Sequence, residues 1–551
     1  MGGESTHGDF PIMASRAEEL RMERLLRVGT CLAECGYGAQ VGPLAATARA
    51  LRADAQLWAA HARYRGAAGG RTLLMHAAWT GSVDRIEFLL ERGADAEAVE
   101  ARVGASALMI ACIAGHCEAA RVLVERGGVN VNLASIDVGM TALMLACAGG
   151  HQEILRCLVE RGGANVNAAR TDDGFTALIW ASQIGHLEIV RYLVERGGAN
   201  LSEARTTDGY TALMWASEFG HLEIVRFLVE RGGANANAAR TTDGCTALMR
   251  ACEFGYLEIV RCLVERGSAN ANAARTTDGF TVLMHACEMG HLEIVRCLVE
   301  PGGANVNAIK TTDGMTALMW ASLKGHLEIV HFLVERGGAH VSAARVTDGY
   351  TALLFASKMG HLEIVRCLQH GGANANTAQT GNGRTALMWA CLKGHLEIAR
   401  CLVERGGVNV NSAQTGDCKT ALMLASEKGH AEIALLLLER WGANVHGTLS
   451  TGGNSFTLAC ERGFVEVARD LLQHGAHVNF QRASDGKTPL MLAAKKGHVA
   501  VVRLLLDRGA LTHLTSHDSR TARDHAASHP LVLAALQDEE SEEDEESEEE
   551  E

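Results

Sequence analysis

The chain has 551 residues, of which 47% are hydrophobic, and its 65 acidic and 51 basic residues give a formal net charge of −14 at pH 7. No run approaches the roughly 18 consecutive apolar residues that a membrane-spanning helix needs, and no leader of the secretory kind opens the chain. These features exclude an integral membrane protein and a secreted protein. We therefore expect a protein of the cytoplasm or the nucleus.

The N-terminal segment differs in pattern from everything that follows it. Residues 1–14 are expected to be disordered, although Gly2 begins a stretch that fits the permissive pattern for N-myristoylation. Ser15 and Glu18 have the spacing of a capping box and predict a helix start. We expect residues 15–70 to form a helical cap that covers the exposed face of the first repeat behind it.

The same segment allows a second interpretation. Pro43-Leu44 and Leu57-Trp58 are similar to the end of an F-box, although the earlier Leu-Pro element of that motif is not evident. An F-box would make these helices a docking module. The chain would then be a substrate-recognition adaptor of a ubiquitin ligase.

Residues 71–515 repeat one motif with a period of 34 or 35 residues. A period of this length indicates a solenoid, in which each repeat contacts only its neighbours. The repeat begins at a Thr in most copies and at Ser106 or Asn454 in two others; the Thr positions are 72, 141, 176, 211, 246, 281, 316, 351, 385, 420 and 488.

One copy, Thr176–Arg205, illustrates the local structure that the motif predicts. Thr176 is a suitable N-cap for a helix of about two turns that ends at Gly185. After His186, apolar residues recur at helical spacing and predict a second, antiparallel helix that ends near Gly197 and Gly198. The polar run from Ala199 to Gly209 predicts a projecting hairpin.

These residues resemble those of ankyrin repeats. The shared elements are Thr-x-Leu-x-x-Ala, Gly-His-Leu-Glu-Ile-Val, Leu-Val-Glu-Arg-Gly and Asp-Gly-x-Thr, and they cover about four fifths of the chain. Only Thr488-Pro489 keeps the Pro of the family's first helix, and most copies carry Met where the family has His. The resemblance implies an all-α solenoid of helix-turn-helix repeats with projecting β-hairpin loops. It also implies binding of proteins along a concave face.

Cysteine and histidine are numerous, but they recur at fixed repeat positions. The series that begins with Cys112 and Cys147 shares its position with Ala and Ser, which indicates a small buried site and a reducing compartment. The His series that includes His186 and His221 places one ring per repeat, too far apart for a shared metal ion. We therefore expect no enzyme activity, no cofactor and no metal site.

The positions that change most between copies are the residue after the loop Gly and the pair before the mid-repeat Gly. In proteins of this kind these positions line the concave face, so the resemblance implies that they contact a partner. In the middle copies they are aromatic, apolar or acidic, and in the later copies they become basic. We predict a binding site for a partner segment that mixes basic and apolar residues, formed by Phe175, Ile184, Tyr210, Glu218, Phe219, Glu253, Phe254, Phe280, Glu288, Met289 and Tyr350. The alternative is that the aromatic residues of the hairpins pack on neighbouring hairpins.

The C-terminal segment contains a predicted cap and an acidic tail. Residues 516–537 are expected to form a capping half-repeat, and residues 538–551 consist of twelve acids with Ser541 and Ser547, which resemble sites for an acid-directed kinase. We predict that the tail is disordered and folds back onto the basic late repeats; the alternatives are a tail that binds a basic partner and a tail that only confers solubility.

The charge of the rest of the chain bears on its partners. Without the tail it carries 53 acids and 51 bases, so nucleic-acid binding ranks below protein binding. We expect a monomer.

Overall fold

The computed structural model describes residues 72–537, which form two compact units, residues 72–269 and residues 270–537. Both units consist of helix pairs, and the described residues contain no strand or sheet. The predicted all-α repeat solenoid is therefore confirmed. The predictions for Gly2, for the cap or F-box-like segment at residues 15–70, for Ser541 and Ser547 and for the acidic tail lie outside the described residues.

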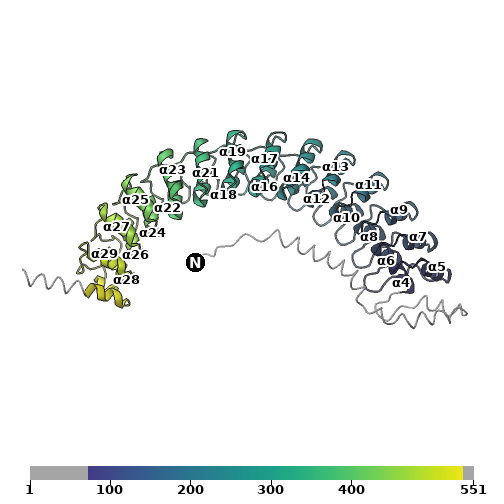
Figure 1. Cartoon of the computed structure of the whole chain (residues 1–551), viewed down its shortest axis with the longest axis horizontal. Coiled ribbons are helices and arrows are strands. Elements are labelled where there is room, and N and C mark those ends of the chain that lie inside the picture. The colour runs from purple at the N-terminus through teal and green to yellow at the C-terminus, as the bar shows by residue number, and fades with distance from the viewer. Residues whose placement is uncertain (1–71, 538–551) are drawn as a thin grey trace, which may run out of the picture. The chain divides into compact units, whose positions relative to one another are not determined.

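Each repeat of the first unit contains a short first helix and a second helix that packs against it (Figure 1). The first helices are α4 (Leu73–Trp79), α6 (Ala107–Ala114), α8 (Ala142–Ala148), α10 (Ala177–Ile184), α12 (Ala212–Glu218) and α14 (Ala247–Glu253). The second helices are α5 (Val83–Glu91), α7 (Cys117–Arg126), α9 (Gln152–Glu160), α11 (Leu187–Glu195), α13 (Leu222–Glu230) and α15 (Leu257–Arg261), which continues as the π-helical turn η2 (Cys262–Arg266).

The second unit repeats this arrangement. Its first helices are α16 (Val282–Met289), α18 (Ala317–Lys324), α20 (Ala352–Met359), α22 (Ala386–Lys393), α24 (Ala421–Lys428), α26 (Ser455–Arg462), α28 (Pro489–Lys496) and the short α30 (Ala522–His525). Its second helices are α17 (Leu292–Val299), α19 (Leu327–Glu335), α21 (Leu362–His370), α23 (Leu396–Gly406), α25 (Ala431–Glu439), α27 (Val465–Gln473) and α29 (Val499–Leu506). No helix within residues 72–537 has the length and apolar character needed to cross a bilayer.

The helix ends follow from the residues at the caps. The hydroxyl of Thr176 accepts a hydrogen bond from the backbone N–H of Ile179 at 3.3 Å, as expected of an N-cap. Gly185 ends the same helix in the left-handed conformation, with φ at 99°. Where Met occupies the position of the family's His, its thioether can complete the cap, since the sulfur of Met423 lies 3.5 Å from the backbone nitrogen of Thr420.

Hydrogen bonds between successive loops hold the repeats of each unit in register. The backbone N–H of Thr206 donates to the carbonyl of Asp173 at 2.8 Å, and that of Thr241 donates to Asp208 at 2.9 Å. On the opposite side of the loop, the Asn167 amide donates to the carbonyl of Gly198. In most repeats the hairpin contains one isolated antiparallel bridge, such as that between Ala204 and Thr211, and no longer strands.

Candidate partner-binding surface

The helix-end position, which directly precedes the glycine of the turn into the second helix, is the last residue or the C-cap of the first helix. Phe219 and Phe254 occupy this position at the ends of α12 and α14, and they are 47% and 48% exposed. Ile184, the equivalent residue of α10, is half-buried. These side chains were predicted to face a partner, and in the structure they are exposed or half-buried.

The aromatic residues that follow the loop glycines are buried, so the prediction that they face water is wrong. Phe175, Tyr210, Phe280 and Tyr350 are only 3–6% exposed. The rings turn away from solvent because each packs on an aromatic side chain of a first helix. The Phe175 centroid lies 5.1 Å from Trp180 and 5.7 Å from Trp215 of the next repeat, and Tyr210 lies 4.7 Å from Trp215. These rings therefore pack within the fold, although their main partners are rings of the first helices and not the neighbouring hairpins.

In the second unit, the same arrangement buries Phe280 and Tyr350. Phe280 lies 4.5 Å from His285 and 5.4 Å from Trp320, and Tyr350 stacks on Phe355 with centroids 4.7 Å apart. Met289, at the end of α16, is exposed. Among the predicted site residues, the exposed apolar ones thus lie at the ends of the first helices and not at the positions after the loop glycines.

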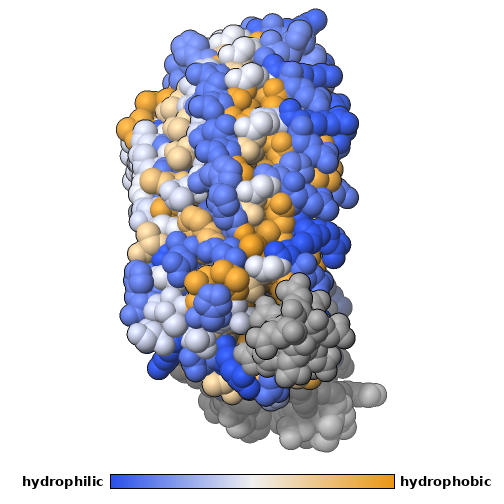
Figure 2. Space-filling model, turned by 90° about the vertical axis from the view of Figure 1, so that its left-hand side faces the viewer, coloured by the Kyte–Doolittle hydropathy of each residue, from blue (hydrophilic) through white to orange (hydrophobic). Residues whose placement is uncertain are grey.

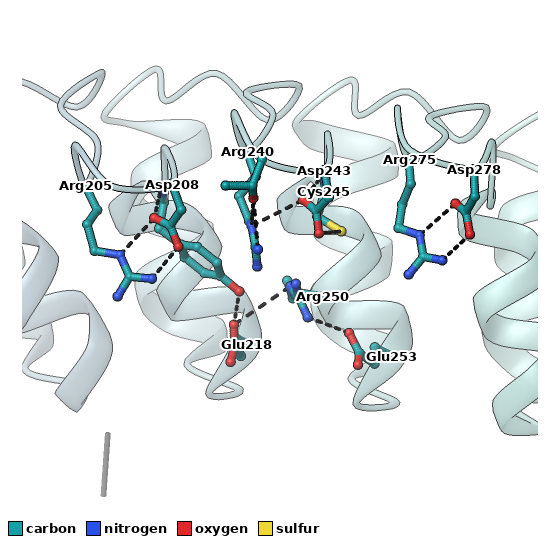
Figure 3. A network of polar contacts seen from close by, with 12 residues as sticks. Arg205, Asp208, Glu218, Arg240, Asp243, Cys245, Arg250, Glu253, Arg275 and Asp278 are labelled. Carbon is teal, nitrogen blue, oxygen red and sulfur yellow. Dashed lines mark hydrogen bonds and ion pairs between the residues drawn. The ribbon is translucent and has the colours of Figure 1, made fainter. Parts of the chain in front are cut away.

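A polar network connects the buried ring of Tyr210 with the two glutamates at the helix ends (Figure 3). The Tyr210 hydroxyl donates to Glu218, whose carboxylate lies 3.9 Å from the guanidinium of Arg250. Arg250 also pairs with Glu253 at 2.7 Å. Burial is the main reason why the pKa of Tyr210 is raised, and it keeps the hydroxyl a donor in this network.

Arg250 was missed in the sequence analysis, although it breaks the pattern of its own helix position. Trp180, Trp215, Trp320 and Trp389 occupy that position in other copies, and an Arg among them was a signal of a polar interaction. Because Arg250 pairs with both Glu218 and Glu253, the net negative charge beside Phe219 and Phe254 is smaller than the two carboxylates alone would give. In the second unit, Glu288 is likewise paired, with Lys324 at 3.4 Å.

Arginines of the hairpins lie over the buried rings. The Arg205 guanidinium lies 5.6 Å from the Tyr210 centroid and 5.4 Å from that of Trp215, within the range of cation–π contacts. It also forms an ion pair with Asp208. Burial raises the pKa of Asp208, but the hydrogen bond and charge of Arg205 outweigh it, so the net pKa lies below the usual value.

The buried cysteines of the described residues are not reactive groups. Burial strongly raises the pKa of Cys112, Cys147 and Cys287, so these thiols are protonated and are poor nucleophiles. Residues 72–537 contain no cluster of His, Cys, Asp and Glu suited to a metal ion. A depression of about 500 Å³ on the second helices of the first unit is lined mainly by Glu and Arg, including Arg156, Glu188 and Arg191, and offers few apolar contacts.

A family model of three ankyrin repeats matches the chain in overlapping segments from residue 45 to residue 518, including residues 163–240, 199–275 and 353–448. The chain belongs to the ankyrin-repeat family. Ankyrin repeats in general support protein interaction, and the family is generally non-catalytic. No curated protein matches this ankyrin chain.

The surface of the ankyrin array is banded. On the face shown in Figure 2, continuous rows of hydrophilic residues run beside rows that contain hydrophobic residues. In four successive repeats of the second unit this helix-end position is occupied by Lys324, Met359, Lys393 and Lys428, and all four side chains are exposed. Two adjacent repeats of the first unit thus present Phe219 and Phe254 at this position, whereas the second unit presents mostly basic residues.

Proposed function

We propose that this ankyrin chain is a non-catalytic scaffold that binds a segment of a protein partner across the ends of its first helices. The observation that carries the proposal is the exposure of Phe219 and Phe254 at equivalent positions of adjacent repeats. Contiguous exposed apolar side chains are uncommon on soluble proteins and often mark an interaction site. Two phenylalanines in adjacent repeats form an apolar surface that extends across both repeats.

Both phenylalanines are held by neighbours rather than free to rotate. Phe219 stacks on Trp215 with centroids 5.7 Å apart and an interplanar angle of 21°, and it also faces His221. Phe254 lies 6.3 Å from Tyr256 at 26°. Rings that are ordered before binding lose less conformational entropy when a partner covers them, which favours aromatic anchors of this kind.

The charges around the phenylalanines limit the chemistry of the partner. Glu218 and Glu253 share one Arg250, so the group retains a net charge of about −1 beside an apolar surface. This supports a partner segment in which apolar residues make the main contacts and a Lys or Arg lies nearby. The buried free cysteines of the array fit a reducing compartment, and we propose a monomer in the cytoplasm or the nucleus.

Photo-crosslinking tests the location of the site. A benzoylphenylalanine in place of Phe219 should capture a partner in cells, whereas the same group in place of Ile136, an exposed hairpin residue of the same unit, should not. The double variant Phe219→Ala and Phe254→Ala should abolish co-purification of the captured partner, because buried aromatic anchors are each worth about 2 kcal/mol or more. Ile136→Ala is the matched control.

Thermal melting separates binding from folding in this experiment. Loss of the partner with an unchanged melting temperature supports the proposal. Equal capture from both crosslinking positions, or full co-purification by the double variant, would contradict it.

A further inference from the structure

The hairpin that precedes α22 lacks an ion pair that the hairpins before α18, α20 and α28 contain. In several other hairpins of this unit a basic residue pairs with an Asp three positions later, as Arg345 does with Asp348 and Arg482 with Asp485. Before α22 these positions are Gln379 and Asn382, so the hairpin has no carboxylate. The Asn382 side chain still accepts a hydrogen bond from the backbone N–H of Arg384 at 3.1 Å, which keeps the turn but leaves the charge of Arg384 uncompensated.

Arg384 and Lys358 approach the same buried ring. The Arg384 guanidinium and the Lys358 amine each lie 4.8 Å from the Trp389 centroid, and Lys358 lies 5.4 Å from that of Tyr350. Trp389 and Tyr350 are 7% and 6% exposed. Two cations therefore lie against the same buried ring, that of Trp389.

The cations of this group lack acceptors. Among residues 72–537, no carboxylate lies within 4.0 Å of Lys358, Arg384 or Lys393, and Arg384 Nε is buried without a hydrogen-bond partner. Burial, followed by the charges of Lys393 and Arg345, lowers the pKa of Lys358, which shows that the cations repel one another. A group of repelling cations is stabilised by a bound anion.

We propose that Lys358, Arg384 and Lys393 form a binding site for the carboxylate side chains of an acidic segment of a protein partner. Arg384 supplies a planar donor pair for one carboxylate, and Lys393, at the exposed end of α22, supplies a point charge for a second. Met359, which follows Lys358 in the chain and is exposed, offers an apolar contact to the same segment. The site is distinct from Phe219 and Phe254, which lie in the first unit.

Two observations favour an acidic protein segment over a nucleic acid. Trp389 and Tyr350 are buried under the cations, so they present no open ring face on which a base could stack. The chain without its tail carries nearly equal numbers of acids and bases, so the cationic group is local and is not part of a broad basic surface.

The chain's own acidic tail fits this site poorly because of its length. The tail has fourteen residues, which span at most about 50 Å when fully extended. The repeats that begin at Thr385 and Thr521 are four steps apart, or roughly 40 Å at about 10 Å per step. Only the last few residues could reach Arg384, at a large cost in entropy, so we assign the site to a partner.

The test uses the full chain and a labelled Glu-rich peptide with one central Leu, followed by fluorescence anisotropy at low and high salt. The peptide should bind, and its counterpart with Gln in place of Glu should not. Lys393→Gln and Arg384→Gln should each weaken binding by about tenfold, as expected for loss of a hydrogen bond between charged groups. Arg400→Gln is the matched control, since Arg400 pairs with Glu397 on the second helix of the same repeat.

The outcomes separate the proposal from its alternatives. Unchanged peptide binding by Lys393→Gln, whose side chain is exposed and should not affect folding, overturns the site. Tighter binding of a single-stranded oligonucleotide than of the peptide, lost in the same variants, assigns it to nucleic acid instead. If replacing the tail carboxylates with Gln in the full chain strengthens peptide binding and Lys393→Gln removes that gain, the tail occupies the site and the partner assignment is wrong.

Discussion

His221 of one repeat lies directly against Gly185 of the repeat before it. The His221 Nε2 is 2.9 Å from the carbonyl oxygen of Gln183, and a Cβ atom at Gly185 would lie 2.6 Å from His221 Cε1. Gly185 therefore satisfies two requirements at once, a left-handed backbone and space for the ring. The same contact recurs between Gly290 and His326. The His series thus joins neighbouring repeats through hydrogen bonds to the ends of the first helices.

Two glycines of one repeat allow these requirements to be separated. Gly185→Ala should destabilise the array more than Gly198→Ala, because both have positive φ but a Cβ at Gly198 would meet nothing within 4 Å. We expect about 1–2 kcal/mol for Gly198→Ala from its backbone alone and a larger loss for Gly185→Ala. Chemical denaturation measures the difference, and limited proteolysis should cut first near the altered repeat. An equal loss of unfolding free energy in the two variants would show that the His221 ring can move away from the new Cβ without destabilising the protein.

Tyr210 and Phe219 differ in burial although both are aromatic residues of the same repeat. Tyr210→Ala should lower stability by about 3–5 kcal/mol, since it removes a packed ring and leaves Glu218 without its hydroxyl partner. Phe219→Ala should cost less than about 1 kcal/mol because half of its side chain is already in water. Denaturation curves of the two variants check this order. A reversed order would mean that Phe219 belongs to the core.

The ion pair between Arg482 and Asp485 should make stability depend on pH. The hydrogen bond from Arg482 holds the pKa of Asp485 far below its usual range, against a smaller opposing effect of burial. Because the folded pKa is the lower one, the pair stabilises the protein above the unfolded pKa of about 3.9 and loses this effect as the pH falls toward the folded value. Asp485→Asn should lower the melting temperature at pH 7, and the difference from wild type should shrink below about pH 4.

A matched control for the pH effect lies in another hairpin of the same unit. Asp417 occupies the equivalent position, but its side chain is 70% exposed and its nearest cation, Lys419, pairs more closely with Glu427. Asp417→Asn should leave the melting temperature near that of wild type at each pH. A similar loss in both variants would assign the effect to the turn and not to the ion pair.

The acidic tail should compete with acidic ligands for lysines near the C-terminal end. The tail is long enough to reach Lys428, Lys495 and Lys496, and none of these lysines forms an ion pair among the described residues. Lys487 already pairs with Asp485. Lys393 lies at the limit of the tail's length. Deleting residues 538–551 should strengthen the binding of acidic peptides to this surface at low salt. The gain should fade as added salt shortens the screening length below its physiological value of about 8 Å. Identical salt curves for both proteins would leave the tail with a role in solubility only.

Local features were predicted correctly because they depend on neighbouring residues. Thr176 and Gly185 mark the ends of α10 as expected, since an N-cap hydroxyl and a left-handed glycine act within one turn of helix. The exposed position of Phe219 was also expected from its place before the glycine. The binding role of these residues stays a prediction, and the functions considered for residues 15–70 lie outside the described part of the chain.

The sequence by itself determined the repeat, its helix pairs and the ankyrin family, because a fixed period and local caps leave few other structures for the backbone. Only the tertiary structure decided which variable residues face solvent. Phe175 is buried because Trp215 of the next repeat completes its packing, and Arg250 is shared because Glu218 of the preceding repeat lies within reach. Burial and charge compensation depend on residues about 30 to 40 positions apart, so no pattern within one repeat could reveal them.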